Sequence, residues 1–304
     1  MRELIRPKRI SLEEQTFSDT YGKFIIEPLE SGYGITLGNA LRRVLLSSIP
    51  GVAITSVKID GVMHEFSTIP GVKEDVLEII QNLKKLRAKL FVDEEKKISL
   101  EARGPLEVKA SHFQTDDEVE IINPDLHIAT LDNEKTRLFM EVTLARGRGY
   151  VEAVENKKEK QPLGTIPIDS IFTPVRKVKY EVRPARIGRK TSYDCLILEI
   201  FTDGTIKPDE AFREAAKILY EYFGFFLEEE KRRSREEFLE REIEEIGLSG
   251  PPLKALKDAG INRVKDLLQK EEKELLKIEN FGEKSLEKVK KKLAEYDLSM
   301  GEEK

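Results

Sequence analysis

Residues 27–51 show the clearest amphipathic pattern in the sequence. A glycine-rich turn leads to Thr36, a residue type favoured at helix N-caps, and Pro50 stops the run of helix formers that follows. We therefore predict a helix over Leu37 to Ile49. At about 100° per residue, one side of this helix is a continuous stripe that faces a core. The stripe consists of Leu37, Ala40, Leu41, Val44, Leu45 and Ser48.

The opposite side of this predicted helix carries Asn39, Arg42, Arg43 and Leu46. A solvated helix face normally carries Lys and Glu and no leucine, whereas arginines around a leucine are typical of a protein contact. We therefore predict that the helix is held between its own core and a partner. The alternative is that Leu46 is an isolated apolar residue on the surface, which is a common occurrence.

Alternating patterns on both sides of this helix predict strands. Short apolar groups alternate with turn residues over 10–30, and Ile54 to Phe66 alternates around Asp60-Gly61, a dipeptide that favours a tight hairpin. Pro70-Gly71 opens a second predicted helix with apolar positions at helical spacing. Residues 98–144 return to a period of two, which predicts sheet. We expect an α+β N-terminal domain built on antiparallel sheet.

A long helix is predicted to begin at Pro208. Asp209 and Glu210 lie in its first turn, where carboxylates suit the positive end of the helix dipole. Its apolar residues, from Ala211 to Leu227, cover far more than a third of the circumference. A helix near the end of a domain that is apolar almost all round indicates subunit association. The alternative is a central helix in the core of a monomer.

The segment from Glu228 to Glu245 is dense in charge and contains neither Pro nor Gly. Its composition marks a domain boundary, and its helix-forming residues predict a semi-rigid helical spacer rather than a flexible tether. From about Ile246 to Met300, short helical patterns separated by turns predict a small all-α domain. We expect this domain to fold on its own.

Composition narrows the possible functions. The 304 residues suffice for more than one domain, and 36% charged residues predict a soluble protein with a charged surface. The net charge of −5 argues against general coating of nucleic acid or membrane, so any DNA contact needs a local patch. Cys195 is the only cysteine, which argues against a disulfide framework or a thiolate metal site. The start lacks a signal-like apolar segment, so we expect a protein of the reducing cytoplasm.

No motif in the sequence contains the set of residues that a catalytic site needs. Gly32, Gly34 and Gly38 come close to a dinucleotide-binding fingerprint, but the third glycine is one residue late and no βαβ unit follows. We interpret these glycines as a tight turn and a helix-packing surface. The three histidines lack metal-ligand spacing, and Asp116-Asp117 lies in a polar turn. We predict no catalytic residue, no metal ion and no cofactor in this protein.

Several longer runs of residues nevertheless identify a family. They occur in a fixed order at Glu27 to Glu30, Thr36 to Arg43, Leu45 to Ser48, Ile59 to Val62, Arg146 to Tyr150, Ser170 to Val175 and Thr202 to Ile206. Because it contains these runs in this order, the sequence closely resembles the alpha-subunit family of bacterial DNA-directed RNA polymerase.

The resemblance implies a domain order and a role. It implies a dimerisation and assembly domain over 1–228 with an inserted, mostly-β subdomain at about 52–170. A charged linker over 229–245 and a helix-hairpin-helix domain over 246–304 follow. The role implied is that of a non-catalytic subunit of a nucleotidyltransferase complex in the cytoplasm, at the nucleoid. It forms a homodimer, recruits the beta and beta-prime subunits, joins omega and sigma in the complex, and contacts promoter DNA or transcription regulators.

The resemblance also assigns contact residues. Matching motif positions place Arg43 and Leu46 at the beta subunit, and Lys84 and Ile168 at the beta-prime subunit. The helical-face pattern agrees for the first pair. For the second pair the residue pattern disagrees, because it predicts that Lys84 is a solvated lysine and that Ile168 is a core residue. The dimer interface is expected at Leu37, Leu41, Phe212, Leu219 and Phe223.

DNA contact in the C-terminal domain is expected from a glycine turn and the helix start after it, at Asn280, Gly282, Lys284 and Ser285. Such a loop presents backbone N–H groups to a phosphate. The family also uses an arginine and an asparagine on an earlier helix to grip an A·T-rich minor groove. The segment from Leu248 to Lys254 contains neither. Residues 238–304 hold 16 acidic and 14 basic residues, a net charge of −2, so we expect weak or sequence-indifferent DNA binding.

Two rival functions follow from the residues alone. A free-standing DNA-binding protein would need a basic C-terminal half, and this sequence lacks one. An enzyme that uses the loop at Gly32 would bind nucleotides without any other subunit.

Overall fold

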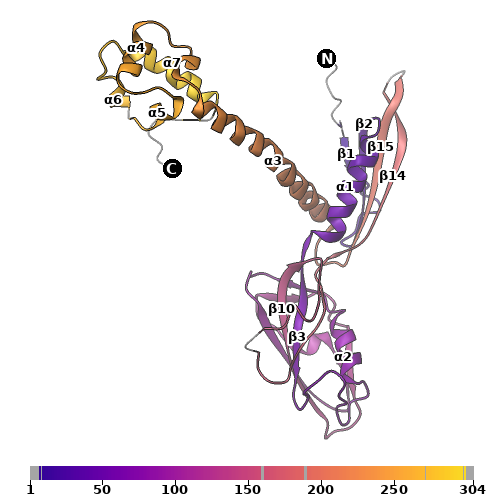
Figure 1. Ribbon diagram of the computed structural model, residues 1–304. Coiled ribbons are helices and arrows are strands. Elements are labelled where there is room, and N and C mark those ends of the chain that lie inside the picture. The colour runs from indigo at the N-terminus through magenta and orange to yellow at the C-terminus, as the bar shows by residue number, and fades with distance from the viewer. Residues whose placement is uncertain are drawn as a thin grey trace. The chain divides into compact units, whose positions relative to one another are not determined.

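The computed structural model describes residues 7, 9–158, 161–187, 190–270, 272–296 and 298 (Figure 1). By its internal contacts the protein divides into two compact units after Leu219. The first unit is a mixed α/β structure with antiparallel sheets, and the second is helical. The predicted α+β fold with a small all-α C-terminal domain is therefore confirmed. Within the described ranges, no helix combines the length and the apolar character needed to cross a membrane.

A four-stranded antiparallel sheet supports the first helix of the first unit. Its strands, in spatial order, are β1 (Arg9–Leu12), β2 (Tyr21–Glu30), β15 (Lys190–Thr202) and β14 (Val175–Ile187). Helix α1 (Tyr33–Ser47) lies along this sheet and packs mainly on β14 and β15 (Figure 1). Leu41 and Leu45 of the helix share a core with Leu198 and Ile200 of β15. Strand β2, near the start of the sequence, thus pairs with β15, the last strand of the unit.

Helix α1 is shifted toward the N-terminus relative to the prediction. It runs over Tyr33–Ser47 instead of Leu37 to Ile49, and its N-cap is Gly32 instead of Thr36. Gly32 has a φ of 91°, a left-handed conformation that glycine adopts without a steric penalty. The Thr36 hydroxyl lies inside the helix, where it donates to the Gly32 carbonyl oxygen at 3.2 Å.

The remaining glycines of this motif let α1 approach the sheet closely. A Cβ atom at Gly38 would lie 2.6 Å from the ring of Tyr180, and one at Gly34 would lie 2.7 Å from Val182. Both distances are far inside van der Waals contact, so only glycine fits at this helix–sheet separation. The interpretation of the glycines as a turn and a helix-packing surface is confirmed.

The segment between α1 and β14 contains a five-stranded antiparallel sheet. Its strands, in spatial order, are β12 (Thr165–Pro167), β3 (Pro50–Ile59), β10 (Arg137–Arg148), β5 (Lys96–Arg103) and β7 (Phe113–Gln114). One face of the sheet forms a core with helix α2 (Val76–Leu83), and the opposite face is polar. Smaller elements are β4 (Ala88–Leu90) with β8 (Val119–Ile121), β6 (Leu106–Lys109) with β9 (His127–Leu131), β11 (Tyr150–Val151) with β13 (Ser170–Ile171), and the 3-10 helix η1 (Ala110–His112).

The hairpin predicted at Asp60-Gly61 is wrong. Gly61 has a φ of 75° and makes a turn, but the residues that follow it to Phe66 form no strand. Strand β3 pairs instead with β10 and β12, which come from much later in the sequence. Because β10 pairs along the whole of β3, from Pro50 to Ile59, it satisfies more backbone groups than a local hairpin partner would.

The second predicted helix begins later than the Pro70-Gly71 pair suggested. Helix α2 starts at Val76, and Asp75 is its N-cap. The Asp75 carboxylate accepts from the Glu78 N–H at 2.7 Å, and the Glu78 carboxylate accepts from the Asp75 N–H at 3.3 Å. This capping box fixes the start, while Val72 forms a β-bridge with Leu131.

Helix α3 (Pro208–Glu240) carries Asp209 and Glu210 in its first turn, as predicted. The charged segment predicted as a helical spacer is part of this helix as far as Glu240. The last turns of α3 also contribute Phe238, which is buried and stacks on Tyr296 at 3.9 Å between ring centroids. The C-terminal core therefore begins upstream of Ile246, the boundary that composition suggested.

The C-terminal core is closed by five short helical elements. They are η2 (Ile243–Ile246), α4 (Pro251–Asp258), α5 (Val264–Leu268), α6 (Glu272–Leu275) and α7 (Glu283–Ala294). Leucines and other apolar residues from each of them meet in one cluster. The composition of this cluster agrees with the apolar positions of the sequence pattern.

Candidate functional site

Helix α1 presents an exposed cationic face away from its sheet. Asn39, Arg42 and Arg43 are exposed, and among the described residues neither arginine side chain is in an ion pair. Leu46 is half-buried against the core beneath α1, and its carbonyl oxygen accepts from the Thr173 hydroxyl at 3.2 Å. Leu46 is therefore not an isolated surface leucine, because it packs the Arg43 side of α1 against the core.

Asp194 holds the N-terminus of α1 in place. One of its carboxylate oxygens accepts from the Gly32 N–H at 2.8 Å and from the Gly34 N–H at 3.1 Å. These are two of the N–H groups that a helix start leaves unsatisfied, and a carboxylate there also suits the helix dipole. Sequence reasoning missed Asp194, because it comes from β15, far along the sequence.

Four of the five residues expected at a dimer interface pack within the protomer itself. Leu41 is buried in the core between α1 and the sheet. Leu37 and Leu219 are half-buried, and the half-buried Phe212 ring stacks on Phe24 with 4.7 Å between centroids. Within the protomer the sheet already covers Leu41, and its expected role at a dimer interface stays a prediction. Phe223 differs, since 63% of its surface is exposed.

Phe223 belongs to a run of exposed apolar side chains on α3. At about 100° per residue these side chains spread over more than half of the helix circumference. A single soluble helix would not leave that much aromatic surface in water. The run consists of Tyr220, Tyr222, Phe223, Phe225, Phe226 and Leu227, and we name it the α3 aromatic surface.

Lys84 is half-buried and takes part in an ion pair, a partner that the sequence pattern did not indicate. It is the C-cap residue of α2, and its ammonium lies 2.9 Å from a carboxylate oxygen of Asp169. The hydrogen bond from Lys84 holds the pKa of Asp169 below its ordinary value. Ile168, next to Asp169, is only 3% exposed and lies in the main core. The interpretation of Ile168 as a core residue is confirmed.

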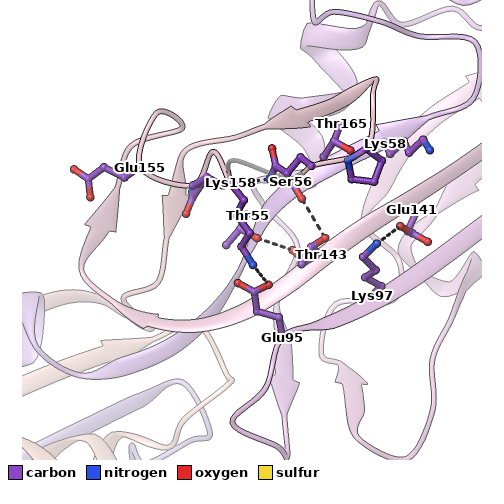
Figure 2. Close-up of a pocket in the computed structure, with 13 residues that line it drawn as sticks. Thr55, Ser56, Lys58, Glu95, Lys97, Glu141, Thr143, Glu155, Lys158 and Thr165 are labelled. Atoms are coloured by element: carbon purple, nitrogen blue, oxygen red, sulfur yellow. Dashed lines mark hydrogen bonds and ion pairs between the residues drawn. The ribbon is translucent and has the colours of Figure 1, made fainter.

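A polar cavity of about 330 Å³ lies on the outer face of the five-stranded sheet (Figure 2). Figure 2 shows two ion pairs at this cavity, in which Lys97 lies 2.8 Å from Glu141 and Lys158 is paired with Glu95. The Ser56 hydroxyl is hydrogen bonded to the Thr143 hydroxyl at 3.1 Å. These groups therefore satisfy each other, and this part of the cavity offers no nucleophile with a base beside it.

The surroundings of His127 and Cys195 give both residues structural roles. His127 lies between Glu74 at 2.9 Å and Glu107 at 3.2 Å. Burial raises the pKa of Cys195 to about 11, and the nearby Glu27 adds to the effect, which makes this thiol unreactive at neutral pH. Within the ranges that the structure describes, no group of three or more His, Cys, Asp or Glu residues could hold a metal ion.

The loop expected to contact DNA begins α7. Asn280 has a φ of 70°, and Gly282 is the N-cap of the helix. Lys284 is exposed, while Ser285 is half-buried and its N–H donates to the Gly282 carbonyl oxygen at 2.9 Å. The four residues therefore share one exposed helix start. The earlier segment, which lacks the family's arginine and asparagine, is helical here as α4, with Pro251 in its first turn.

Comparisons with known proteins agree on one family. A family model described as the RNA polymerase Rpb3/RpoA insert domain matches residues 57–173. A second model, which describes the C-terminal domain of the bacterial RNA polymerase alpha subunit, matches residues 228–295. Three relatives are each named DNA-directed RNA polymerase subunit alpha. The relative from Symbiobacterium thermophilum is 52% identical over 93% of both proteins. The relative from Desulforamulus reducens is 50% identical over 100% of this protein and 99% of its own length, and that from Alkaliphilus oremlandii is 51% identical over 98% and 97%.

Proposed function

The chain belongs to the alpha-subunit family of bacterial DNA-directed RNA polymerase, and we propose that it is the homodimeric platform on which the beta and beta-prime subunits assemble. As an alpha subunit it is part of a nucleotidyltransferase complex. The family resemblance implies that the catalytic residues lie on other subunits. This subunit then contributes contact surfaces to the complex. They are the α3 aromatic surface, the exposed face of α1, the end of α2 and the start of α7.

The α3 aromatic surface is the observation that carries the proposed dimerisation. Its side chains spread around the helix, so one neighbouring element could cover only part of them. A second copy of the protein supplies the same aromatic residues at a two-fold interface, which is self-complementary. The resemblance also assigns Leu37, Leu41, Phe212 and Leu219 to the dimer interface. Within the first unit, Leu41 is buried in the core and the other three are half-buried.

Sedimentation of the full-length protein tests the dimer. Covering the exposed 63% of Phe223 removes roughly 100 Å² of apolar surface from water, or about 2–3 kcal/mol for each copy. Phe223→Glu should therefore raise the dimer dissociation constant by at least about a hundredfold. Phe66→Glu is the matched control, because Phe66 is 74% exposed in the first unit and lies outside the surface. A wild-type protein that sediments as a monomer at micromolar concentration would refute the dimer.

The exposed face of α1 is the proposed contact for the beta subunit. Arg43 is exposed and in no ion pair with a described residue, so its guanidinium is available for carboxylates on a partner. Leu46 is half-buried beneath it and fixes the helix against the core. Arg43 then makes the specific contact with the beta subunit, and Leu46 supports the helix face that carries Arg43.

The end of α2 is the proposed contact for the beta-prime subunit. The Lys84 ammonium is held at a defined position by Asp169, and it retains donor N–H groups for a partner. Ile168 supports this site from the core, since its side chain is buried.

The C-terminal domain is the proposed contact for promoter DNA or transcription regulators. The helix start at Asn280, Gly282, Lys284 and Ser285 supports phosphate binding through backbone N–H groups. Pro251 begins α4 in the segment that lacks the family's arginine and asparagine, so minor-groove reading is weakened. In the cell, this role places the protein at the nucleoid in the cytoplasm, in a complex that also contains omega and sigma.

A further inference from the structure

Asp169 joins three separate segments of the first unit. One carboxylate oxygen accepts from the Lys84 ammonium at 2.9 Å, at the C-terminal end of α2. The other accepts from the Ala153 N–H at 2.9 Å, in the turn after β11. Asp169 itself lies between β12 and β13. A single side chain therefore sets the position of a helix end, a turn and a strand connection relative to one another.

Further hydrogen bonds, which are partly or fully buried, hold the same turn. The Asn156 amide donates to the Ile168 carbonyl oxygen at 2.8 Å and to the Ser170 hydroxyl at 2.9 Å. The Ser170 hydroxyl donates in turn to the Ile54 carbonyl oxygen on β3 at 2.8 Å. The Ile168 N–H donates to the Thr55 carbonyl oxygen at 3.0 Å. The backbone that carries Asp169 is thus held to the main sheet.

Exposed apolar side chains lie on the segments next to this ion pair. Tyr150 is 59% exposed and is the cross-strand partner of Ile171, which is also exposed. Paired residues of antiparallel strands project on the same side of the sheet. Val154, one residue after Ala153, is 78% exposed. Exposed aromatic and aliphatic side chains around a half-buried cation are typical of the centre of a protein interface.

We propose that Asp169 is a positioning residue for the beta-prime contact, which it organises by fixing the Lys84 ammonium beside Tyr150 and Val154. This inference rests on the function proposed above for Lys84. An ammonium has three N–H donors, and Asp169 occupies one, so two remain for acceptors on the partner. The partner segment therefore offers carboxylate or carbonyl oxygens to Lys84 and apolar side chains to Tyr150 and Val154. Ile168 acts from beneath, as part of the core that carries Asp169.

The fixed geometry explains why a carboxylate is needed at this position. A free lysine side chain samples many rotamers and loses that freedom when a partner binds it. The ion pair with Asp169 restricts the rotamers in the unbound subunit, so less entropy is lost on binding. The hydrogen bonds from Lys84 and the Ala153 N–H also lower the pKa of Asp169, because they favour its charged form.

A double-mutant cycle on the full-length protein tests the positioning role. Asp169→Asn retains an oxygen for the Ala153 N–H but removes the charge that holds Lys84, and Lys84→Gln removes the ammonium. Each variant is assembled with the beta subunit, and beta-prime is then titrated onto the complex. We expect Asp169→Asn to weaken beta-prime binding about tenfold, with dimerisation, beta binding and Tm unchanged. The double variant should bind as weakly as Lys84→Gln alone, because Asp169 acts through Lys84.

A matched control is Asp125→Asn, which removes a surface carboxylate paired with Lys109 at 3.8 Å elsewhere in the same unit. It should bind beta-prime like the wild type. The positioning role is overturned if Asp169→Asn binds normally, if the two single effects add, or if lost binding follows a lowered Tm. If Lys84→Gln itself binds normally, the beta-prime contact proposed for Lys84 fails as well. If only Lys84→Gln is weakened, the contact stands and the role of Asp169 fails.

Discussion

Replacement of Asp194 by alanine isolates the interaction that places helix α1. The Asp194 carboxylate accepts from the N–H groups of Gly32 and Gly34 at 2.8 and 3.1 Å. The N-cap residue is a glycine, so the helix has no side chain of its own that could replace this acceptor. Alanine keeps the β15 backbone pairing with Leu29 and Pro184 and removes only the cap.

The expected cost follows from the two contacts that are lost. Removing an N-cap side chain costs about 1–2 kcal/mol. Loss of a negative charge at the positive end of the helix dipole adds roughly 0.3–1 kcal/mol. The exposed N–H of Gly32 can be hydrated in the variant, so we expect a total of about 2 kcal/mol. For a unit of this size, that corresponds to a Tm lowered by roughly 4–8 °C.

Urea unfolding, followed by far-UV circular dichroism and tyrosine fluorescence, measures this loss, and hydrogen exchange locates it in α1. Asp194→Asn retains an acceptor without the charge and should lose no more than about 1 kcal/mol. Asp19→Ala is the control, because Asp19 is an exposed carboxylate 3.6 Å from Lys207. If Asp194→Ala stays within about 0.5 kcal/mol of the wild type, the cap does not hold α1 and the role given to Asp194 is refuted.

Three further predictions concern the beta-subunit contact, the carboxylate of Glu74 and DNA binding. Arg43→Ala should preserve the dimer yet weaken beta-subunit recruitment at least about tenfold in a pull-down, and normal recruitment would contradict the role of that helix face. Burial opposes the ionisation of Glu74, but the Thr130 N–H and His127 more than offset it, so the Glu74 pKa lies below its ordinary value of 4.5. A lowered pKa contributes stability above pH 4.5 that is lost as pH falls through the folded-state pKa, so Glu74→Gln should flatten the acid limb of a pH–urea series. The full-length protein should bind A·T-rich and G·C-rich duplexes equally weakly by fluorescence anisotropy, and Lys284→Ala should reduce the salt slope by about one; a clear A·T preference would contradict this.

The sequence by itself determined the elements whose signals are local. The amphipathic stripe from Leu37 to Ser48, the period-two block over 98–144 and the start of α3 at Pro208 each depend on spacing within a few residues. Such periodicity sets which side chains a helix or strand buries, so the α+β class and the helical C-terminal domain followed from the pattern. The aromatic run around Phe223 likewise indicated an association surface from its pattern alone.

Only the tertiary structure decided the contacts between segments far apart in the sequence. Strand β3 looked like half of a local hairpin, but it pairs with β10, because a partner along its whole length satisfies more of its backbone. The cap of α1 comes from Asp194, and the ion pair of Lys84 comes from Asp169, each from a segment remote in sequence. A period identifies the buried face of an element but not the element that covers it, so the pattern placed Leu41 in a core and only the structure showed that β14 and β15 cover it.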